Sequence, residues 1–265
     1  MFLDRKSKSL RSKNRIFHSN PLHKCVRIPP LEFLLDSTLV PDHIRVMNFT
    51  HSLLSNISDK HLLKHAFYQA WNEGNIPVET LRLYAEQYFQ HVKAFPRYVS
   101  ATHSHCDQIK ARQVLLDNLI DEEKGEENHP ELWLRFAEGI GTSRSRAETA
   151  ESLPETKELV DTFMNLSGSS YAAGLGALFA YENQVPEIAQ FKIEALKKHY
   201  DIEEQSTALS FFKVHLQTDI YHRQALGHLL DELSAEDQQV AQKAARVAAD
   251  QLWKFLDGIY RTMCL

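Results

Sequence analysis

The chain has 265 residues, a formal net charge of −5 and 43% hydrophobic residues, which suits one large domain with an appendage or, at most, two small domains. No apolar run approaches the roughly 20 residues that a membrane-spanning helix needs, and the slightly acidic balance offers no basic surface for nucleic acid. Membrane and nucleic-acid partners are therefore excluded. The three cysteines, at positions 25, 106 and 264, have no paired spacing, which predicts a reducing compartment such as the cytoplasm.

The amino-terminal segment differs in composition from the rest of the chain. Within residues 1–30, eight Lys or Arg residues face a single acid, Asp4, and this composition predicts disorder. Three origins stay open: a transit-type presequence, a basic tail, or a start assigned too early, with Met47 as an internal start. We therefore divide the chain into an extension over 1–43, with a short helix over 31–40, and a helical domain over 44–265.

From about residue 44 onward the pattern is helical almost throughout, because apolar residues recur at intervals of three and four and no stretch alternates as a strand would. Ser58 or Asp59 can begin a helix, Gly74 can end it, and Pro77 suits the first turn of the next helix. The predicted helices cover about 58 to 73, 77 to 93 with a kink or new start at 96 toward 105, 107 to 125, 130 to 140, 154 to 166, 170 to 184, 186 to 200, 204 to 230, and 234 to 259, with a connection over 141 to 152. Eight or nine helices with short connections predict a compact all-α bundle.

The most informative stretch is 215 to 222, within the long predicted helix. His215, Asp219 and His222 fall within roughly 60° of one another on a helix, along an apolar stripe that includes Phe212 and Leu226. They should therefore point into the core, where an ionisable group is costly unless something such as a metal ion compensates it. Taken alone, this stretch fits a solvated polar helix face with two incidental histidines equally well.

Two other predicted helices repeat this anomaly. Glu182 continues an apolar stripe on its helix, where Gly174 and Gly176 would let a neighbouring element approach closely. Glu122 continues the stripe of its own helix in the same way, and His129 enters from the following loop or the next helix. A single inward carboxylate would usually be a salt-bridge or helix-end residue. Three such segments together indicate a site.

Six side chains from these segments offer three carboxylates and three imidazoles: Glu122, His129, Glu182, His215, Asp219 and His222. Such mixed oxygen and nitrogen ligands suit two iron or manganese ions with positions open to dioxygen. Helical bundles commonly hold metal pairs on Glu and His residues from several helices. The sequence has no thiolate set and no His-Glu-x-x-His motif, so a structural zinc or a zinc protease is not expected.

Four long runs of this sequence resemble the family of the chlamydial protein associating with death domains and its bacterial relatives. The runs are Lys60–Tyr68, Lys93–Tyr98, Leu115–Glu123 and Tyr181–Pro186. The resemblance extends from about residue 47 to 260 and leaves out the first thirty to forty residues. It implies the haem-oxygenase-like helical fold that this family shares with pyrroloquinoline quinone synthase-like and thiaminase-like proteins.

The resemblance also implies that the six side chains are the family's metal ligands, and that the enzyme makes para-aminobenzoate for folate synthesis from its own side chains. Tyr68 matches the tyrosine that supplies the ring, Lys192 matches the proposed amino donor, and Tyr84 and Tyr181 match further tyrosines lining the site. Phe211 departs from the family pattern, which has tyrosine there, so a relay through that position is in doubt. The implied cofactors are two metal ions, Fe/Fe or Fe/Mn, with dioxygen and an external reductant.

Residue chemistry is compatible with these implied roles. A lysine that attacks a ring must be neutral, and burial beside a metal pair lowers its pKa in that direction. Without the resemblance, a core tyrosine and a surface lysine would be the ordinary interpretations of Tyr68 and Lys192.

Two other functions stay open: a dimetal oxidase or oxygenase acting on a free small molecule, and an interaction protein that binds death domains. The fold often pairs, which favours a homodimer. The expected compartment is the cytoplasm, or an organelle if residues 1–30 are a transit sequence.

Overall fold

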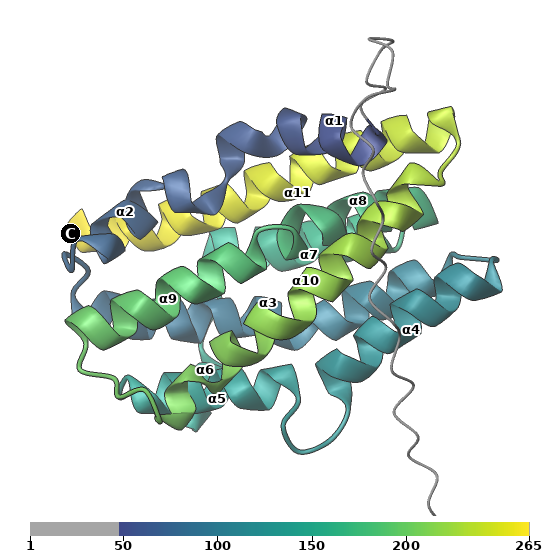
Figure 1. Cartoon of the computed structure of the whole chain (residues 1–265). Coiled ribbons are helices and arrows are strands. Elements are labelled where there is room, and N and C mark those ends of the chain that lie inside the picture. Colours follow the sequence, from purple (N-terminus) through teal and green to yellow (C-terminus); the bar gives the residue numbers. More distant parts are fainter. Residues whose placement is uncertain (1–47, 265) are drawn as a thin grey trace, which may run out of the picture. The chain divides into compact units, whose positions relative to one another are not determined.

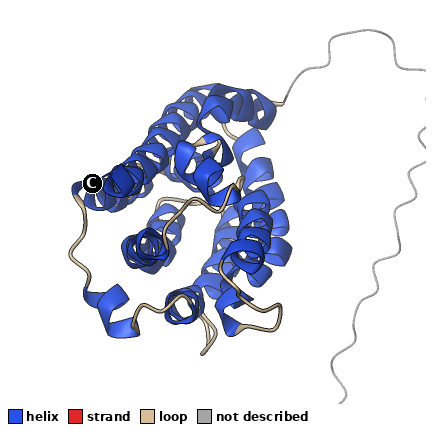
Figure 2. Ribbon diagram, turned by 90° about the vertical axis from the view of Figure 1, so that its left-hand side faces the viewer, coloured by secondary structure: helices blue, strands red, loops and turns tan. Residues whose placement is uncertain are grey.

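The computed structural model describes residues 48–264, and in that part of the chain every regular element is a helix (Figures 1 and 2). The predicted all-α architecture is therefore confirmed for these residues. The α-helices are α1 (Phe49–Ile57), α2 (Ala66–Asn72), α3 (Val78–Ser104), α4 (Ile109–Glu123), α5 (His129–Gly139), α6 (Arg144–Thr149), α7 (Pro154–Ser167), α8 (Tyr171–Glu182), α9 (Val185–His199), α10 (Ser210–Asp231) and α11 (Ala235–Arg261). Short 3₁₀ turns lie at Ser58–Lys60, Leu62–Lys64, Thr207–Leu209 and Thr262–Cys264. The predicted extension, 1–43, with its helix over 31–40, lies outside the described residues, and the domain boundary stays a prediction.

Helix α8 is the innermost helix of the bundle. Its residues from Ala172 to Glu182 are all buried, as expected for a helix that is apolar on every side. Two glycines allow this depth: a Cβ atom at Gly176 would lie 2.1 Å from the carbonyl oxygen of Ala241 in α11, and one at Gly174 would lie 2.2 Å from the hydroxyl oxygen of Thr102 in α3. The close approach expected from these glycines is confirmed. Because α8 ends at Glu182, this packing delivers a carboxylate to the interior.

The predicted helix over 58 to 73 is wrong in detail, because two histidines divide it. His61 and His65 have extended backbone, and each side chain accepts a hydrogen bond from the backbone N–H two residues later, at Leu63 and Phe67. Each histidine thus ends one turn and caps the next. Only the last part of the segment is an α-helix, α2, which carries Tyr68.

Two further expectations differ from the structure. Helix α3 runs through Pro96 without a new start, because Pro96 is buried and tertiary packing outweighs the lost backbone hydrogen bond. The connection expected over 141 to 152 contains a short helix, α6, whose cap Ser143 accepts a hydrogen bond from the backbone N–H of Arg146.

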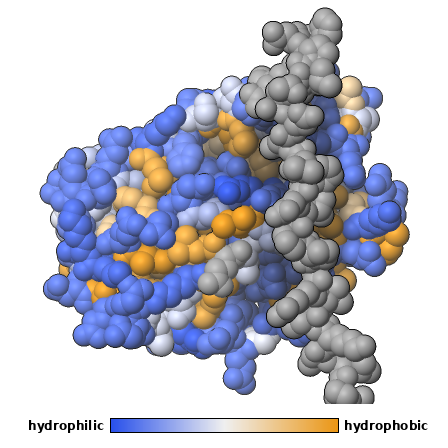
Figure 3. Space-filling view, viewed as in Figure 1, coloured by the Kyte–Doolittle hydropathy of each residue, from blue (hydrophilic) through white to orange (hydrophobic). Residues whose placement is uncertain are grey.

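The face of the molecule drawn in Figure 3 is mostly hydrophilic, with apolar residues confined to narrow strips. The most exposed large apolar side chains include Ile109 on α4 and Tyr221 on α10, at 67% and 59%. None of the helices in the described part is long and apolar enough to cross a bilayer. Cys106 is buried with a free thiol.

Candidate metal centre

Four helices carry the six predicted ligands, and all six side chains are buried. Glu122 is one residue from the end of α4, and the next helix, α5, starts with His129 as its first residue after the cap Asn128. His129 therefore enters from the next helix, one of the two routes that the sequence left open. Glu182 ends α8, and the remaining three ligands lie on one side of α10: His215, Asp219 and His222.

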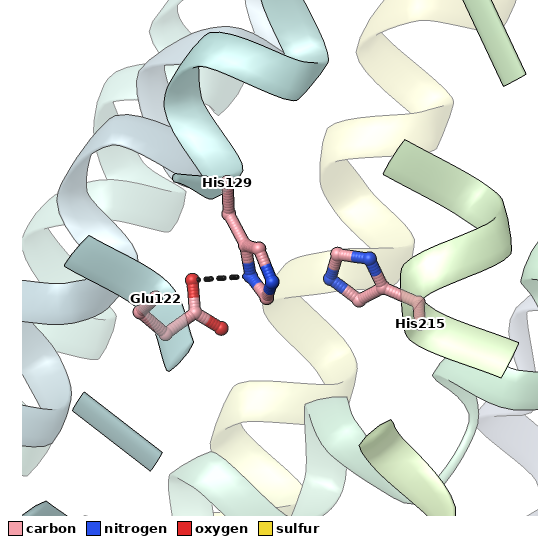
Figure 4. Close-up of side chains that lie close together, drawn as sticks. All are labelled: Glu122, His129 and His215. Atoms are coloured by element: carbon pink, nitrogen blue, oxygen red, sulfur yellow. Dashed lines mark ion pairs between the residues drawn. The ribbon is translucent and has the colours of Figure 1, made fainter. Parts of the chain in front are cut away.

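Three of these side chains converge on one point (Figure 4). One ligand atom each from Glu122, His129 and His215 can be chosen so that all three lie within 4.8 Å of one another. The Nδ1 atom of His129 is 2.7 Å from Oε2 of Glu122, the ion pair dashed in Figure 4, whereas Nε2 of His129 has no hydrogen-bond partner. Burial lowers the pKa of His129, but the charge of Glu122 outweighs it and raises the pKa. A carboxylate and two imidazoles gathered this closely fit a shared cation.

The other three side chains form a second group beside the first. His222 Nδ1 lies 3.8 Å from Oε2 of Glu182 and 3.7 Å from Oδ1 of Asp219. Asn118 donates a hydrogen bond of 2.9 Å to Oε1 of Glu182, whereas Oε2 has no partner. The unpaired oxygen of Glu182 thus lies near an imidazole nitrogen and a second carboxylate, a set of donors that suits a second cation.

Titration behaviour shows how strongly this cluster needs positive charge. The pKa of Glu182 is raised to about 8, chiefly by burial and in smaller part by the carboxylates of Asp219 and Glu122. Burial opposes protonation of His222, but the nearby carboxylates, with Asp219 foremost, outweigh it and raise its pKa to about 9. Burial lowers the pKa of His215. Protons therefore compensate part of the buried negative charge in this chain, and divalent cations on the same atoms would compensate it better.

Asp121 is a functional candidate that the sequence analysis missed. Its Oδ2 atom lies 3.0 Å from Nε2 of His222, the ring nitrogen that faces away from Glu182 and Asp219. A carboxylate in this place fixes the ring orientation and leaves the other nitrogen free to bind a metal. The signal was present in the sequence, because Asp121 directly precedes a predicted ligand on α4.

A second cluster surrounds the predicted amino donor. The Nζ atom of Lys192, on α9, donates a hydrogen bond of 2.7 Å to the hydroxyl oxygen of Tyr84, and the Tyr84 and Tyr68 hydroxyls are 3.3 Å apart. All three side chains are buried. The Nζ atom also lies 5.8 Å from the ring centre of Tyr68. The structure therefore brings together the two side chains that the resemblance gives as sources of ring and nitrogen.

Burial dominates the chemistry of this second cluster. It lowers the pKa of Lys192 to about 7, and it raises the pKa of both Tyr68 and Tyr84. Aromatic faces lie around the amine, including Tyr88 at 5.1 Å and Trp133 at 5.3 Å. Such faces favour an ammonium ion by about 2 kcal/mol or more when desolvated, yet the effect of burial is larger and the pKa of Lys192 is lowered. A large fraction of Lys192 is thus a neutral amine near pH 7.

Tyr88 extends the second cluster toward Tyr181 and was not singled out from the sequence. Its ring stacks on Tyr84 with centroids 5.3 Å apart, and its hydroxyl donates a hydrogen bond of 3.0 Å to the hydroxyl of Tyr181. The charges of Asp219 and Glu122 raise the pKa of both Tyr88 and Tyr181, after the larger effect of burial. Its position four residues after Tyr84 on one helix face was the available signal.

Phe211, the departure from the family pattern, lies against the metal ligands. Its ring is 4.1 Å from the ring of His215 and 5.9 Å from that of His129, centre to centre. The backbone carbonyl of Phe211 also accepts a hydrogen bond of 2.6 Å from Nδ1 of His215, which leaves Nε2 of that imidazole available. The side chain packs beside the ligands and brings no hydroxyl.

Known proteins resemble this chain over most of its length. A model of a family described as iron-containing redox enzymes matches residues 82–252. A 4-aminobenzoate synthase of Nitrosomonas europaea is 43% identical over 82% of this chain and 92% of its own length, and one of Chlamydia muridarum is 40% identical over 80% and 90%. The structure of a domain of unknown function from Shewanella denitrificans, with a haem-oxygenase-like fold, gives a TM-score of 0.67 at 15% identity, covering 81% of this chain and 91% of that one. The predicted haem-oxygenase-like fold is confirmed.

Proposed function

Because this chain belongs to the family of iron-containing redox enzymes, we propose that it is a 4-aminobenzoate synthase that forms its product from its own Tyr68 and Lys192. Two relatives named 4-aminobenzoate synthase, at 43% and 40% identity, support the product. The observation that carries the internal source is the buried contact of Lys192, Tyr84 and Tyr68, with the amine hydrogen-bonded to Tyr84 and close to the Tyr68 ring.

Glu122, His129 and His215 would hold one metal ion, and Glu182, Asp219 and His222 a second. The oxygen and nitrogen donors, without a thiolate, favour two irons or iron with manganese. When bound and reduced by an external donor, such ions supply the activation of dioxygen. Asp121 orients His222, and Asn118 fixes one oxygen of Glu182.

The remaining roles belong to the chain's own side chains. Lys192 presents a neutral amine, which is the form that can attack a ring. The Tyr84 hydroxyl accepts the hydrogen bond from Lys192, so it holds the amine over the aromatic cluster and can exchange a proton with it. Tyr68 supplies the six-membered ring, and its burial at 2% exposure keeps water from the reacting atoms. Tyr88 and Tyr181 extend this cluster through the hydrogen bond between their hydroxyls, and Tyr181 directly precedes the predicted ligand Glu182 on α8.

The experiment compares 4-aminobenzoate formed per chain after iron, manganese, reductant and oxygen are added. We expect at most one product molecule per chain in the wild type, none in Tyr68→Phe, and none in Glu182→Ala, which removes a metal donor. Tyr260→Phe serves as the control, because Tyr260 is a half-buried tyrosine whose ring reaches His65, 6.4 Å away, and neither cluster. Repeated turnover with Tyr68 intact would instead show an oxidase or oxygenase acting on a free small molecule.

Homodimer formation, death-domain binding and a cytoplasmic or organellar location stay predictions from the sequence.

A further inference from the structure

Tyrosine and tryptophan rings continue from the reacting cluster to the surface. The indole of Trp71 stacks on Tyr68, with ring centres 5.9 Å apart, and lies edge-on to Tyr84 at 5.7 Å. Trp71 also lies edge-on to Tyr200, with ring centres 6.4 Å apart. These separations fall within the contact range of aromatic pairs. The chain of contacts reaches Tyr200 from Tyr84 without passing through Tyr68.

Tyr200 is the point where this series of rings meets solvent. Among the described tyrosines and tryptophans that Trp71, Tyr84 and Tyr88 contact, Tyr200 is only half-buried, whereas the others are buried. It lines a surface pocket of about 420 Å³ together with Arg82 and His199. Small water-soluble molecules can therefore approach the Tyr200 ring.

The surroundings of Trp71 suit the transfer of an electron and not of a proton. Trp71 is fully buried, and its indole N–H has no hydrogen-bond partner. A buried donor without an acceptor is unusual. An oxidised Trp71 would have no nearby base for its proton, so it would remain a short-lived cation radical and pass the charge on. The Tyr200 hydroxyl, by contrast, donates a hydrogen bond of 2.8 Å to the backbone carbonyl of Ile76, at the half-buried end of the path. A phenol becomes strongly acidic when it is oxidised, so its proton can leave from there to solvent.

We propose that Trp71 and Tyr200 form a path that removes an unused oxidising equivalent from the tyrosine cluster to a one-electron donor, such as ascorbate, in the surface pocket. The inference rests on the proposed function, whose oxygen chemistry supplies the one-electron oxidant. Oxidised Tyr84 passes its hydroxyl proton to Lys192, then regains an electron from Trp71 and its proton from Lys192. Trp71 takes an electron from Tyr200, which releases a proton to solvent. The donor returns one electron and solvent one proton to Tyr200, so that only the donor is oxidised.

The test follows tyrosine radicals by rapid-freeze electron paramagnetic resonance in the full chain, loaded with iron or iron and manganese and exposed to oxygen. Ascorbate should shorten the life of the radical signal in the wild type and in Tyr260→Phe. This acceleration should be lost in Trp71→Phe and in Tyr200→Phe. Tyr200→Phe alters only the half-buried end of the path, so it answers the question even if Trp71→Phe unfolds. A nitroso spin trap followed by peptide mapping should also label Tyr200 in the wild type and much less in Trp71→Phe.

The outcomes separate this inference from the proposed function. In one outcome, the wild type and the three variants form product at the same yield, ascorbate shortens the radical signal equally in all four proteins, and Tyr200 is not labelled. This outcome overturns the path and leaves the proposed function standing. Labelling of Tyr200 that depends on Trp71, without any 4-aminobenzoate, supports the path and contradicts the function. If neither radical transfer nor product is observed, both the path and the proposed function are overturned.

Discussion

The Nζ atom of Lys192 donates a 2.7 Å hydrogen bond to the hydroxyl of Tyr84 inside a fully buried aromatic cluster. A buried lysine without a carboxylate partner is costly to a fold. Its hydrogen bond to a phenol compensates only part of that cost, because a phenol cannot neutralise an ammonium charge. The arrangement suits a reactive amine better than a structural one.

Replacement of Lys192 by methionine should raise stability while it abolishes product. The pKa of Lys192 is about 7 in the folded chain against an ordinary value of 10.5, so the unfolded chain binds the additional proton between these values, and the free energy of unfolding rises with pH across that window. At pH 7 the penalty amounts to about 4 kcal/mol, which sets the upper limit of the gain. Thermal and denaturant unfolding would measure it, with Lys198→Met as the exposed control on the same helix. A large loss of stability in Lys192→Met would show that the amine is structural.

The rate of a single turnover should increase with pH on either side of neutrality. Only the neutral amine can attack, and half of the Lys192 side chains are neutral near pH 7. Product formation by pre-loaded enzyme, followed between about pH 6 and pH 8, should rise and then level off. A flat profile, or a rate that falls with pH, would contradict the role given to Lys192.

Asp121→Asn should weaken metal binding more than it weakens the fold. Loss of the carboxylate that orients a metal-binding histidine typically costs 10- to 100-fold in metal affinity or activity, and we expect about that much here. Asp117→Asn is the matched control, because Asp117 is exposed one turn earlier on α4. Titration calorimetry with iron(II) or manganese(II) gives the affinities. Equal metal affinities in the two variants would contradict the role of Asp121 in orienting His222.

Gly176→Ala should destabilise the bundle, since the added Cβ would lie 2.1 Å from the carbonyl oxygen of Ala241. Overpacking of this kind costs about 1–3 kcal/mol. Gly227→Ala provides the opposite case on α10, where the nearest atom to the added Cβ is 3.5 Å away, and the better helix propensity of alanine should leave stability equal or higher. Chemical denaturation of both variants tests the packing of α8 on α11. Equal stability of the two variants would contradict that packing.

Much of this arrangement could be predicted from residue patterns. Helical periodicity predicted the inward position of Glu182, at the end of an apolar stripe. It also predicted that three polar residues lie on one side of α10. The positions of glycine and proline residues predicted where several helices begin or end. The break at His65 could not be predicted in this way, because histidine is not a usual cap, and its role depends on tertiary contacts such as the 3.0 Å contact between Nε2 and Asp257.

The contacts of the second cluster could not be predicted from local sequence patterns. Tyr68, Tyr84 and Lys192 come from three helices, α2, α3 and α9. Lys192 lies on the buried face of α9, four residues after Ile188 and four before Leu196, but this spacing does not show which side chains of other helices it meets. Only the resemblance pointed to these residues. The continuation through Trp71 to Tyr200 was not predicted at all, since a contact between residues so far apart in the sequence depends on how the helices pack.

The most direct measurement is the mass of the protein, labelled with ring-¹³C tyrosine, before and after reaction with metal, reductant and oxygen, with peptide mapping across Tyr68 and Lys192. We expect that Tyr68 loses its side chain and that ¹³C-labelled 4-aminobenzoate appears in equal amount, no more than one molecule per chain. An unchanged Tyr68 together with unlabelled product, or with repeated turnover on an added substrate, would contradict it.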